Sequence, residues 1–152
     1  MSNVPGLRSP YIMVGRLVYF GRMLDKIRLH AAGRLPVDEY VPNLSKGFDS
    51  RCCGFLRVDY DELRKRALAG KDSDEQLLAW AEERGGRRPD EDCELWNSFM
   101  MKRGFRDEVT TRLADRVREG GFEGKPIMTM FDYIDFDEGR DPVSARAWER
   151  KG

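Results

Sequence analysis

The chain has 152 residues, which is the usual size of a single domain and enough to bury one hydrophobic core. Hydrophobic residues make up 40% of it and charged residues 36%, a composition that excludes a disordered polymer and predicts a globular protein with a strongly charged surface. The 27 basic side chains are balanced by 27 acidic ones, which argues against nucleic acid as the partner.

The sequence shows neither a membrane span nor an export signal. Its longest uninterrupted apolar run, 77–81, has five residues, against the ~20 that cross a bilayer, and residues 1–8 lack the apolar core of a signal peptide. Cys52, Cys53 and Cys93 are an odd number with a vicinal pair, unlike a secreted disulfide framework. The chain has a single histidine, and its cysteines do not show the spacing of zinc ligands. We therefore expect a soluble, cytoplasmic protein with reduced thiols, no membrane contact, no metal and no cofactor.

The first part of the chain is predicted to hold two helices separated by a long loop. After an irregular start to Gly15, a three-then-four spacing of apolar residues predicts a helix over 16–32. The proline-containing loop 34–47 exceeds the ~12 residues usual for a connector, so we expect it to have a function or hidden structure. A short apolar helix is predicted over 48–56.

Start and stop residues predict five further helices. Capping patterns open the first two, an acidic first turn after Pro89 favours the third, and Thr129 with Asp132 caps the last. These helices span 59–69, 73–84, 89–103, 107–119 and a short stretch from Thr129. We predict an all-α, compact single domain of about five to seven short helices with long ordered loops and an irregular start and end. Residues 1–140 form the domain, and 141–152 form a charged tail that frays.

The first predicted helix carries a basic stripe. Arg22, Lys26 and His30 are four residues apart, and Asp25 lies beside them. The stripe could hold an anion, and His30 is the only imidazole available for acid-base chemistry. Alternatively, Asp25 pairs with Arg22 or Arg28 on the helix surface and the stripe is an ordinary solvated face.

Two other groups of reactive side chains have structural explanations as well as chemical ones. Arg51 next to Cys52 and Cys53 could lower a thiol pKa, although buried thiols that only pack are the more common case. Near the end of the chain, five acidic residues suggest a metal, but the glycine falls one place too early for a calcium loop. Helix capping and solvation by an acidic turn are the favoured explanation of these residues, which are Asp132, Asp135, Asp137, Glu138 and Asp141.

The chain also resembles a known family. The strings that carry the resemblance are Leu7-Arg8-Ser9-Pro10, Arg22 to Arg28, Phe48-Asp49 with Arg51, Asp74-Glu75 to Trp80, and Thr129 to Arg140. In these strings the chain is similar to an uncharacterised bacterial family that is catalogued only as a domain of unknown function. The resemblance runs from Leu7 to about Arg140 and implies a bacterial, stand-alone helical protein, but no activity.

Polar residues that match the family strings are the candidate site. They are Arg8, Asp25, Lys26, Asp49, Arg51, Asp132 and Asp135, to which the basic stripe adds Arg22 and His30. These nine residues either bind a ligand or form a structural network that ties loops to the first helix.

Three functions agree with the sequence. The first is a non-catalytic module, either a monomer or a homo-oligomer, that binds a small anionic ligand or a protein partner. Its polar pocket would lie near Arg22, Asp25, Lys26 and His30. The second is a small hydrolase or isomerase that uses Asp25 or His30 as acid or base. The third is a structural, partner-binding helical domain, which predicts an exposed apolar patch.

Overall fold

A computed structural model describes residues 3–149 of the chain. Within that range the chain forms nine α-helices and two 3-10 helices, and its only bridge between extended residues is the isolated one at Val14 and Leu17. The helices are α1 (Phe20–Ala31), α2 (Val37–Tyr40), η1 (Val41–Asn43), α3 (Phe48–Leu56), α4 (Tyr60–Leu68), α5 (Asp74–Gly85), α6 (Asp90–Lys102), α7 (Thr110–Glu119), α8 (Met130–Asp137), α9 (Pro142–Ala145) and η2 (Ala147–Glu149).

The prediction of an all-α domain is confirmed, but the number of helices was set too low. The two α-helices that raise it, α2 and α9, have four residues each and lie where a loop and a tail were expected. Pro36 is the N-cap of α2 and Pro142 is the first residue of α9, and the fixed φ of proline suits the start of a helix even where no apolar period is long enough to detect.

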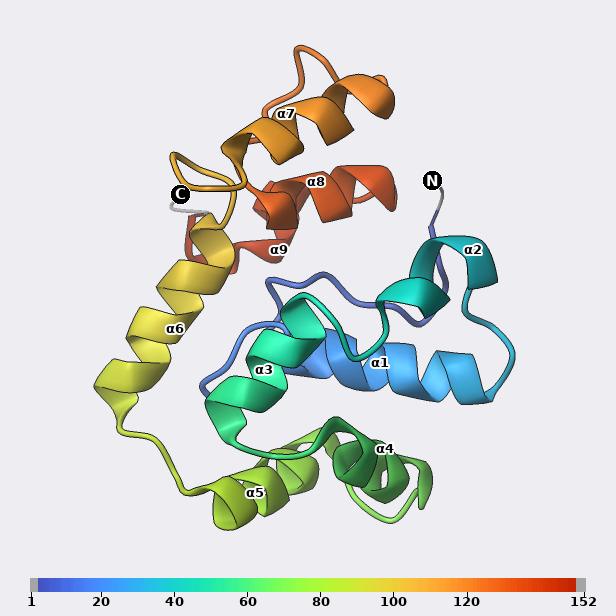
Figure 1. Ribbon diagram of the computed structural model, residues 1–152, viewed down its shortest axis with the longest axis vertical. Helices are drawn as coiled ribbons and strands as arrows, with labels where there is room; N and C mark the ends of the chain where they lie inside the picture. The colour runs from blue at the N-terminus through green and yellow to red at the C-terminus, as the bar shows by residue number, and fades with distance from the viewer. Residues whose placement is uncertain (1–2, 150–152) are drawn as a thin grey trace.

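The helices lie in three tiers along the long axis of the molecule (Figure 1). The lower tier consists of α4 and α5, the middle tier of α1, α2 and α3, and the upper tier of α7 and α8, while α6 runs along one side from the lower to the upper tier. Helix α1 packs on both α4 and α5, and α8 packs on α6 and α7. Helix α1 thus lies between other helices, and most of its residues are buried.

The main core is built around α1. Phe20, Met23, Leu24 and Ile27 are at most 1% exposed and pack with residues of α3, α4, α5 and α8. Burial on nearly all sides explains why α1 also buries charged side chains, which must then find partners within the protein.

Helix α1 begins later than the apolar spacing predicts. Val14 and Leu17 exchange backbone hydrogen bonds in a tight turn, and Tyr19 follows in the left-handed region with φ 71°. A residue with this backbone conformation cannot continue a helix, so the first helical residue is Phe20 and not Arg16.

The predicted caps of three helices are confirmed. The side chain of Asp59 accepts a hydrogen bond from the N–H of Glu62 at the start of α4, and Ser73 and Gln76 form a reciprocal capping box on α5. Thr129 accepts from the N–H of Asp132 at the start of α8. At Pro89 the prediction was one residue early, since this proline is the N-cap of α6 and the helix starts at the next residue.

The long loop 34–47 contains hidden structure, as its length suggested. It forms α2 and η1, and its residues Leu35 and Tyr40 pack with Val4, Leu7 and Leu29 in a second hydrophobic cluster. This cluster fixes the loop against the end of α1, so that its outer side becomes one wall of the site described below.

The segment that follows α8 is described as far as Glu149. Asp141 caps α9 by accepting a hydrogen bond from the N–H of Val143, and Pro142 is buried. Arg146 forms an ion pair with Asp132 of α8. Residues 150–152 of the predicted tail lie outside the described residues.

Candidate functional site

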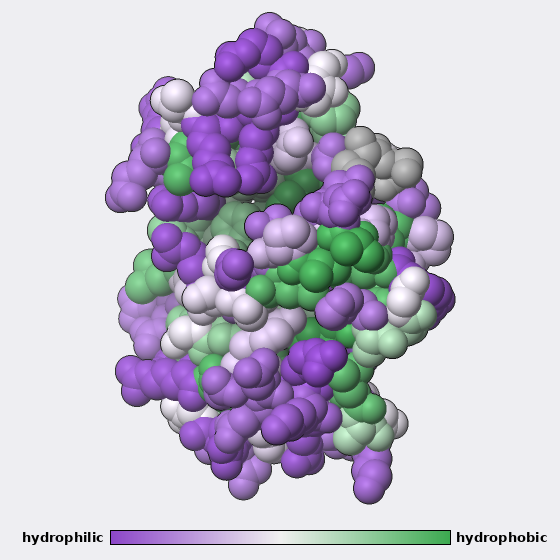
Figure 2. Space-filling view, turned by 45° about the vertical axis from the view of Figure 1, so that its right-hand side comes forward, coloured by the Kyte–Doolittle hydropathy of each residue, from purple (hydrophilic) through white to green (hydrophobic). Residues whose placement is uncertain are grey.

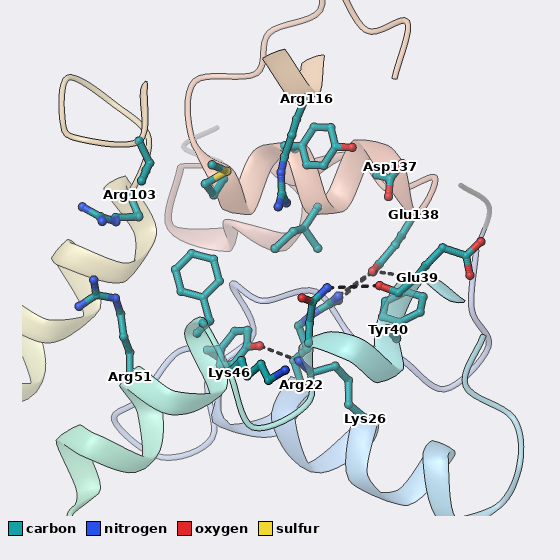
Figure 3. Close-up of a pocket in the computed structure, with 18 of the residues that line it drawn as sticks. Arg22, Lys26, Glu39, Tyr40, Lys46, Arg51, Arg103, Arg116, Asp137 and Glu138 are labelled. Carbon is teal, nitrogen blue, oxygen red and sulfur yellow. Dashed lines mark hydrogen bonds and ion pairs between the residues drawn. The ribbon is translucent and has the colours of Figure 1, made fainter. Parts of the chain in front are cut away.

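A cavity of about 410 Å³ lies between the middle tier and the upper tier (Figure 3). Helices α1 to α3 and the loop before α3 form one side, and α7, α8 and the end of α6 form the other. Its walls combine charged, aromatic and apolar side chains: Tyr19, Arg22, Lys26, Glu39, Tyr40, Asn43, Lys46, Gly47, Phe48, Arg51, Arg103, Val109, Arg112, Arg116, Met130, Tyr133, Ile134, Asp137 and Glu138. Seven of these residues are basic and three are acidic.

Two arginines from different helices converge at one end of the cavity. The guanidinium carbon of Arg51 lies 4.9 Å from the centre of the Phe99 ring, and that of Arg103 lies 5.4 Å from the same centre. Figure 3 shows the two side chains facing one another. Arg103 is also 3.6 Å from a carboxylate oxygen of Asp107, whereas Arg51 has no ion-pair partner among the described residues. Two cations held over one aromatic ring attract an anion between them.

Helix α7 adds two cations to the upper wall. Arg112 and Arg116 are four residues apart and both line the cavity, and Figure 3 shows Arg116 reaching down from its helix. Among the described residues neither side chain has a hydrogen-bond or ion-pair partner, and the same is true of Lys46 on the opposite wall. The cavity is therefore bordered by basic groups whose charge the described protein does not neutralise locally.

The floor of the cavity contains a buried cluster of Tyr19, Lys26 and Asp49. The Nζ of Lys26 lies 2.7 Å from Oδ1 of Asp49 and 2.9 Å from the hydroxyl oxygen of Tyr19, which itself donates to Oδ1 of Asp49 over 2.7 Å. The second carboxylate oxygen of Asp49 accepts from the backbone N–H of Ser45. Burial lowers the pKa of Lys26, although the charge of Asp49 opposes this effect.

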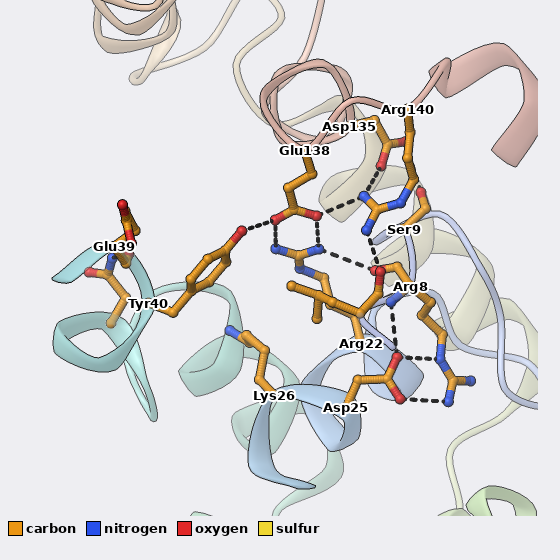
Figure 4. A network of polar contacts seen from close by, with 12 residues as sticks. Arg8, Ser9, Arg22, Asp25, Lys26, Glu39, Tyr40, Asp135, Glu138 and Arg140 are labelled. Carbon is orange, nitrogen blue, oxygen red and sulfur yellow. Dashed lines mark hydrogen bonds and ion pairs between the residues drawn. The ribbon is translucent and has the colours of Figure 1, made fainter. Parts of the chain in front are cut away.

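A second buried network adjoins the floor (Figure 4). Glu138 accepts two hydrogen bonds from the guanidinium of Arg22, at 2.8 and 2.6 Å, and one each from Tyr40 and Arg140. Arg140 also pairs with Asp135, whose other oxygen accepts from Ser9. Burial would raise the pKa of Glu138, but the bonds from Arg22, Tyr40 and Arg140 outweigh it and lower that pKa. This network ties α1, α2 and the end of α8 together and fixes one wall of the cavity.

Apolar side chains complete the lining. Phe48, Val109, Met130 and Ile134 lie between the charged groups. Figure 2 shows a hollow, with hydrophobic residues inside it, beneath the hydrophilic upper part of the molecule. A cavity of this size with an apolar surface and a few converging polar groups is typical of small-molecule sites.

The family of the chain is shown by its sequence match. A family model described as a domain of unknown function, DUF5069, matches residues 4–140. The chain belongs to this family. The match includes every residue that lines the cavity, so the whole site lies inside the DUF5069 domain. No curated protein matches the chain significantly.

The DUF5069 domain brings some of the nine predicted residues together. Arg22, Lys26 and Arg51 line the cavity, and Asp49 lies directly behind Lys26. Two of these come from α1 and two from α3, which explains why the basic stripe of one helix indicated only part of the site.

The other predicted residues lie elsewhere in the domain. Asp25 is held by Arg8, whose Nε and Nη2 donate to its two oxygens over 2.8 and 2.9 Å (Figure 4). Asp132 pairs with Arg146 and accepts from Tyr11, while Asp135 is fully buried against Ser9 and Arg140. His30 is half-buried on α1 and does not line the cavity.

The expected surface pairing of Asp25 with Arg22 or Arg28 was wrong. Asp25 is 8% exposed and is paired with Arg8, seventeen residues earlier, while Arg22 binds Glu138 and Arg28 binds Asp74. The reason is that α1 is buried on almost all sides, so its charged groups meet partners from other segments and not from the same helix face.

Sequence reasoning missed the upper wall of the cavity. Arg112 and Arg116 were not singled out in the predicted helix 107–119, and Arg103 marked only the end of the predicted helix 89–103. The spacing of the two α7 arginines was a usable signal. What the sequence did not contain was the distance between α7 and α3, which the path of α6 determines. On the opposite wall, five residues of loop 34–47 line the cavity: Glu39, Tyr40, Asn43, Lys46 and Gly47.

The described residues show no reactive environment around the thiols and no metal site at the acidic turn. Cys52, Cys53 and Cys93 are all buried and free, and burial raises the pKa of Cys53 to about 12. Within residues 3–149 no group of three or more His, Cys, Asp or Glu side chains is placed to hold a metal ion. In the same range no helix is long and apolar enough to cross a membrane.

Proposed function

We propose that this chain binds a small organic anion in the cavity between its middle and upper tiers. The observation that carries the proposal is the set of four basic side chains that line the cavity without an ion-pair partner among the described residues: Lys46, Arg51, Arg112 and Arg116. Lys46 and Arg51 belong to α3 and the loop before it, whereas Arg112 and Arg116 belong to α7. The convergence of these two distant stretches is therefore a property of the fold.

The charge arrangement favours an anion over a neutral ligand. Cations that line one concave, partly apolar space repel each other more strongly than cations on open surface, because less water screens them. A phosphate or carboxylate group between Arg51 and Arg103 on one side and Arg116 on the other would remove this repulsion. Arginine suits the task because its planar fork donates two parallel hydrogen bonds to such groups.

The apolar part of the lining supports an organic ligand rather than a bare ion. Phe48, Met130 and Ile134 offer a contact surface for a carbon skeleton next to the cationic groups. The volume of about 410 Å³ falls inside the range of ~300–1,000 Å³ that is usual for small-molecule sites.

Calorimetric titration at low salt tests the proposal, with inorganic phosphate and a phosphorylated sugar as probes. We expect both to bind and the Arg116→Ala variant to bind them about tenfold more weakly, since a lost charge-assisted hydrogen bond costs ~1.5 kcal/mol or more. Arg118→Ala is the matched control, because Arg118 is on the same helix, pairs with Asp115 and does not line the cavity. Equal losses in the two variants, or no heat with either probe, would refute the proposal.

A further inference from the structure

Tyr19 has an unusual backbone for a bulky residue. Its φ is 71° and its ψ is −29°, in the left-handed region that side chains larger than Asn rarely adopt. The residue is 3% exposed and lines the cavity floor. Strain of this kind persists only where the surrounding structure enforces it, and it concentrates at functional sites. Here it places the Tyr19 hydroxyl between Lys26 and Asp49.

Lys26 is a buried amine that faces the cavity. Its side chain is 8% exposed, and Asp49 and Tyr19 account for two of its three N–H groups. The third has no partner among the described residues. An ordinary buried Lys–Asp pair requires neither a strained tyrosine nor an opening beside the amine, so the arrangement exceeds what stability alone demands.

The charges around Lys26 come from three segments. Burial lowers the pKa of its ammonium group, Asp49 raises it, and nearby Arg22 lowers it further, while Glu138 acts in the opposite direction. The net direction of the pKa shift is downward, which increases the fraction of neutral amine relative to an ordinary lysine. Desolvated lysines with accessible nitrogen atoms are the ones that react as nucleophiles.

We propose that Lys26 forms a reversible imine with the carbonyl group of an anionic aldehyde or oxo acid bound in the cavity. The basic side chains hold the anionic group of this ligand, so the inference rests on the proposed function and adds the ligand's second functional group. Lys46, which lines the same cavity but is exposed, has no such surroundings and serves as an internal comparison.

The reaction balances within the buried cluster. The ammonium group of Lys26 first gives one proton to Asp49, and the neutral nitrogen attacks the carbonyl carbon. The proton returns from Asp49, directly or through the Tyr19 hydroxyl, to the former carbonyl oxygen, and the attacking nitrogen gives this oxygen a second proton. The C–O bond then breaks as the C=N bond forms, and the oxygen leaves as water. The products are a protonated imine and one water molecule, so the nitrogen keeps its positive charge and the buried Asp49 keeps its counter-ion.

Pyridoxal 5′-phosphate is a suitable probe, because it carries an aldehyde and a phosphate on one small ring. The full-length protein is incubated with the probe near neutral pH and reduced with borohydride, and the modified lysines are identified by peptide mapping. We expect about tenfold more label on Lys26 than on Lys46 at early times, because the bound phosphate holds the aldehyde of the probe beside the buried amine. Excess inorganic phosphate should protect Lys26 from labelling.

The outcomes separate this inference from the proposed function. Label on Lys46 and other exposed lysines with Lys26 unmodified would overturn the inference, while phosphate binding by calorimetry would leave the proposed function standing. In the Lys26→Arg variant, which keeps a positive charge next to Asp49, we expect loss of the rapid label. Undiminished rapid labelling in that variant would also overturn it. Mapping of the wild-type protein decides the question even if the variant folds poorly.

Discussion

Replacing Arg22 with methionine tests how the cavity wall is held together. Arg22 and Glu138 have side chains that are 5% and 3% exposed, and they share two hydrogen bonds of 2.8 and 2.6 Å. The variant leaves the carboxylate of Glu138 buried, with only Tyr40 and Arg140 as donors. Removing one partner of a buried ion pair costs ~3–5 kcal/mol, a large share of the ~5–15 kcal/mol that stabilises a domain.

Thermal and urea unfolding would measure this loss. For a chain of this length the expected fall in Tm is ~6–20 °C, at ~2–4 °C per kcal/mol. Replacing both residues, as in Arg22→Met with Glu138→Leu, should recover much of the stability because no buried carboxylate is then left without the charge of Arg22. The exposed pair of Arg118 with Asp115 supplies the control, and Arg118→Ala should leave Tm almost unchanged, because exposed ion pairs contribute little to stability. If Arg22→Met cost as little as Arg118→Ala, the pair would not hold the wall and the reasoning would fail.

Three further predictions concern backbone packing, acid stability and thiol reactivity. A Cβ added at Gly85 would lie 1.8 Å from the carbonyl oxygen of Leu56, so Gly85→Ala should destabilise the fold by at least ~1–3 kcal/mol in urea unfolding. Gly54→Ala, where nothing lies within 4 Å, should instead stabilise α3 by ~0.5–1 kcal/mol; similar values for both would contradict the close approach. The pKa of Glu138 is lowered on folding. The ionised carboxylate therefore stabilises the fold above the ordinary pKa of 4.5, and this stabilisation is lost as the pH falls below that value. Wild-type Tm should therefore fall more steeply than that of Glu138→Gln in melting curves taken below about pH 4.5, and parallel curves would count against this. Because the Cys53 thiol is buried and its pKa is raised to about 12, Ellman's reagent at pH 8 should react slowly with it until urea unfolds the protein, and a fast native reaction would disprove that burial.

Local signals in the sequence were enough for most of the helices. The predicted helix 48–56 coincides with α3, and the caps at Ser73 and Thr129 form as expected, because a cap depends on residues within one turn of each other. Local signals failed where tertiary contacts override them. The apolar period around Leu17 continues a helical pattern, yet the bridge at Val14 and the left-handed Tyr19 delay the start of α1.

The candidate site was predictable only in part. Arg22 and Lys26 were found because they recur on one helix face, and Arg51 because it matches a family string. Whether the charge of such a residue is available to a ligand or is neutralised by an ion pair depends on partners far away in the chain. Arg8 of the irregular start takes Asp25 out of reach of a ligand, whereas Glu138 fixes Arg22 at the wall.

By itself, the sequence determined the class of fold, the existence of the seven longer helices and the caps of several of them, and the family. These properties depend on composition and on contacts between near neighbours in the chain. Only the tertiary structure decided which charges are neutralised and which are not, because ion pairing depends on distances between segments that periodicity does not encode. The same buried α1 carries Asp25, closed off by Arg8, and Lys26, next to an open cavity whose opposite wall comes from α7, more than eighty residues later.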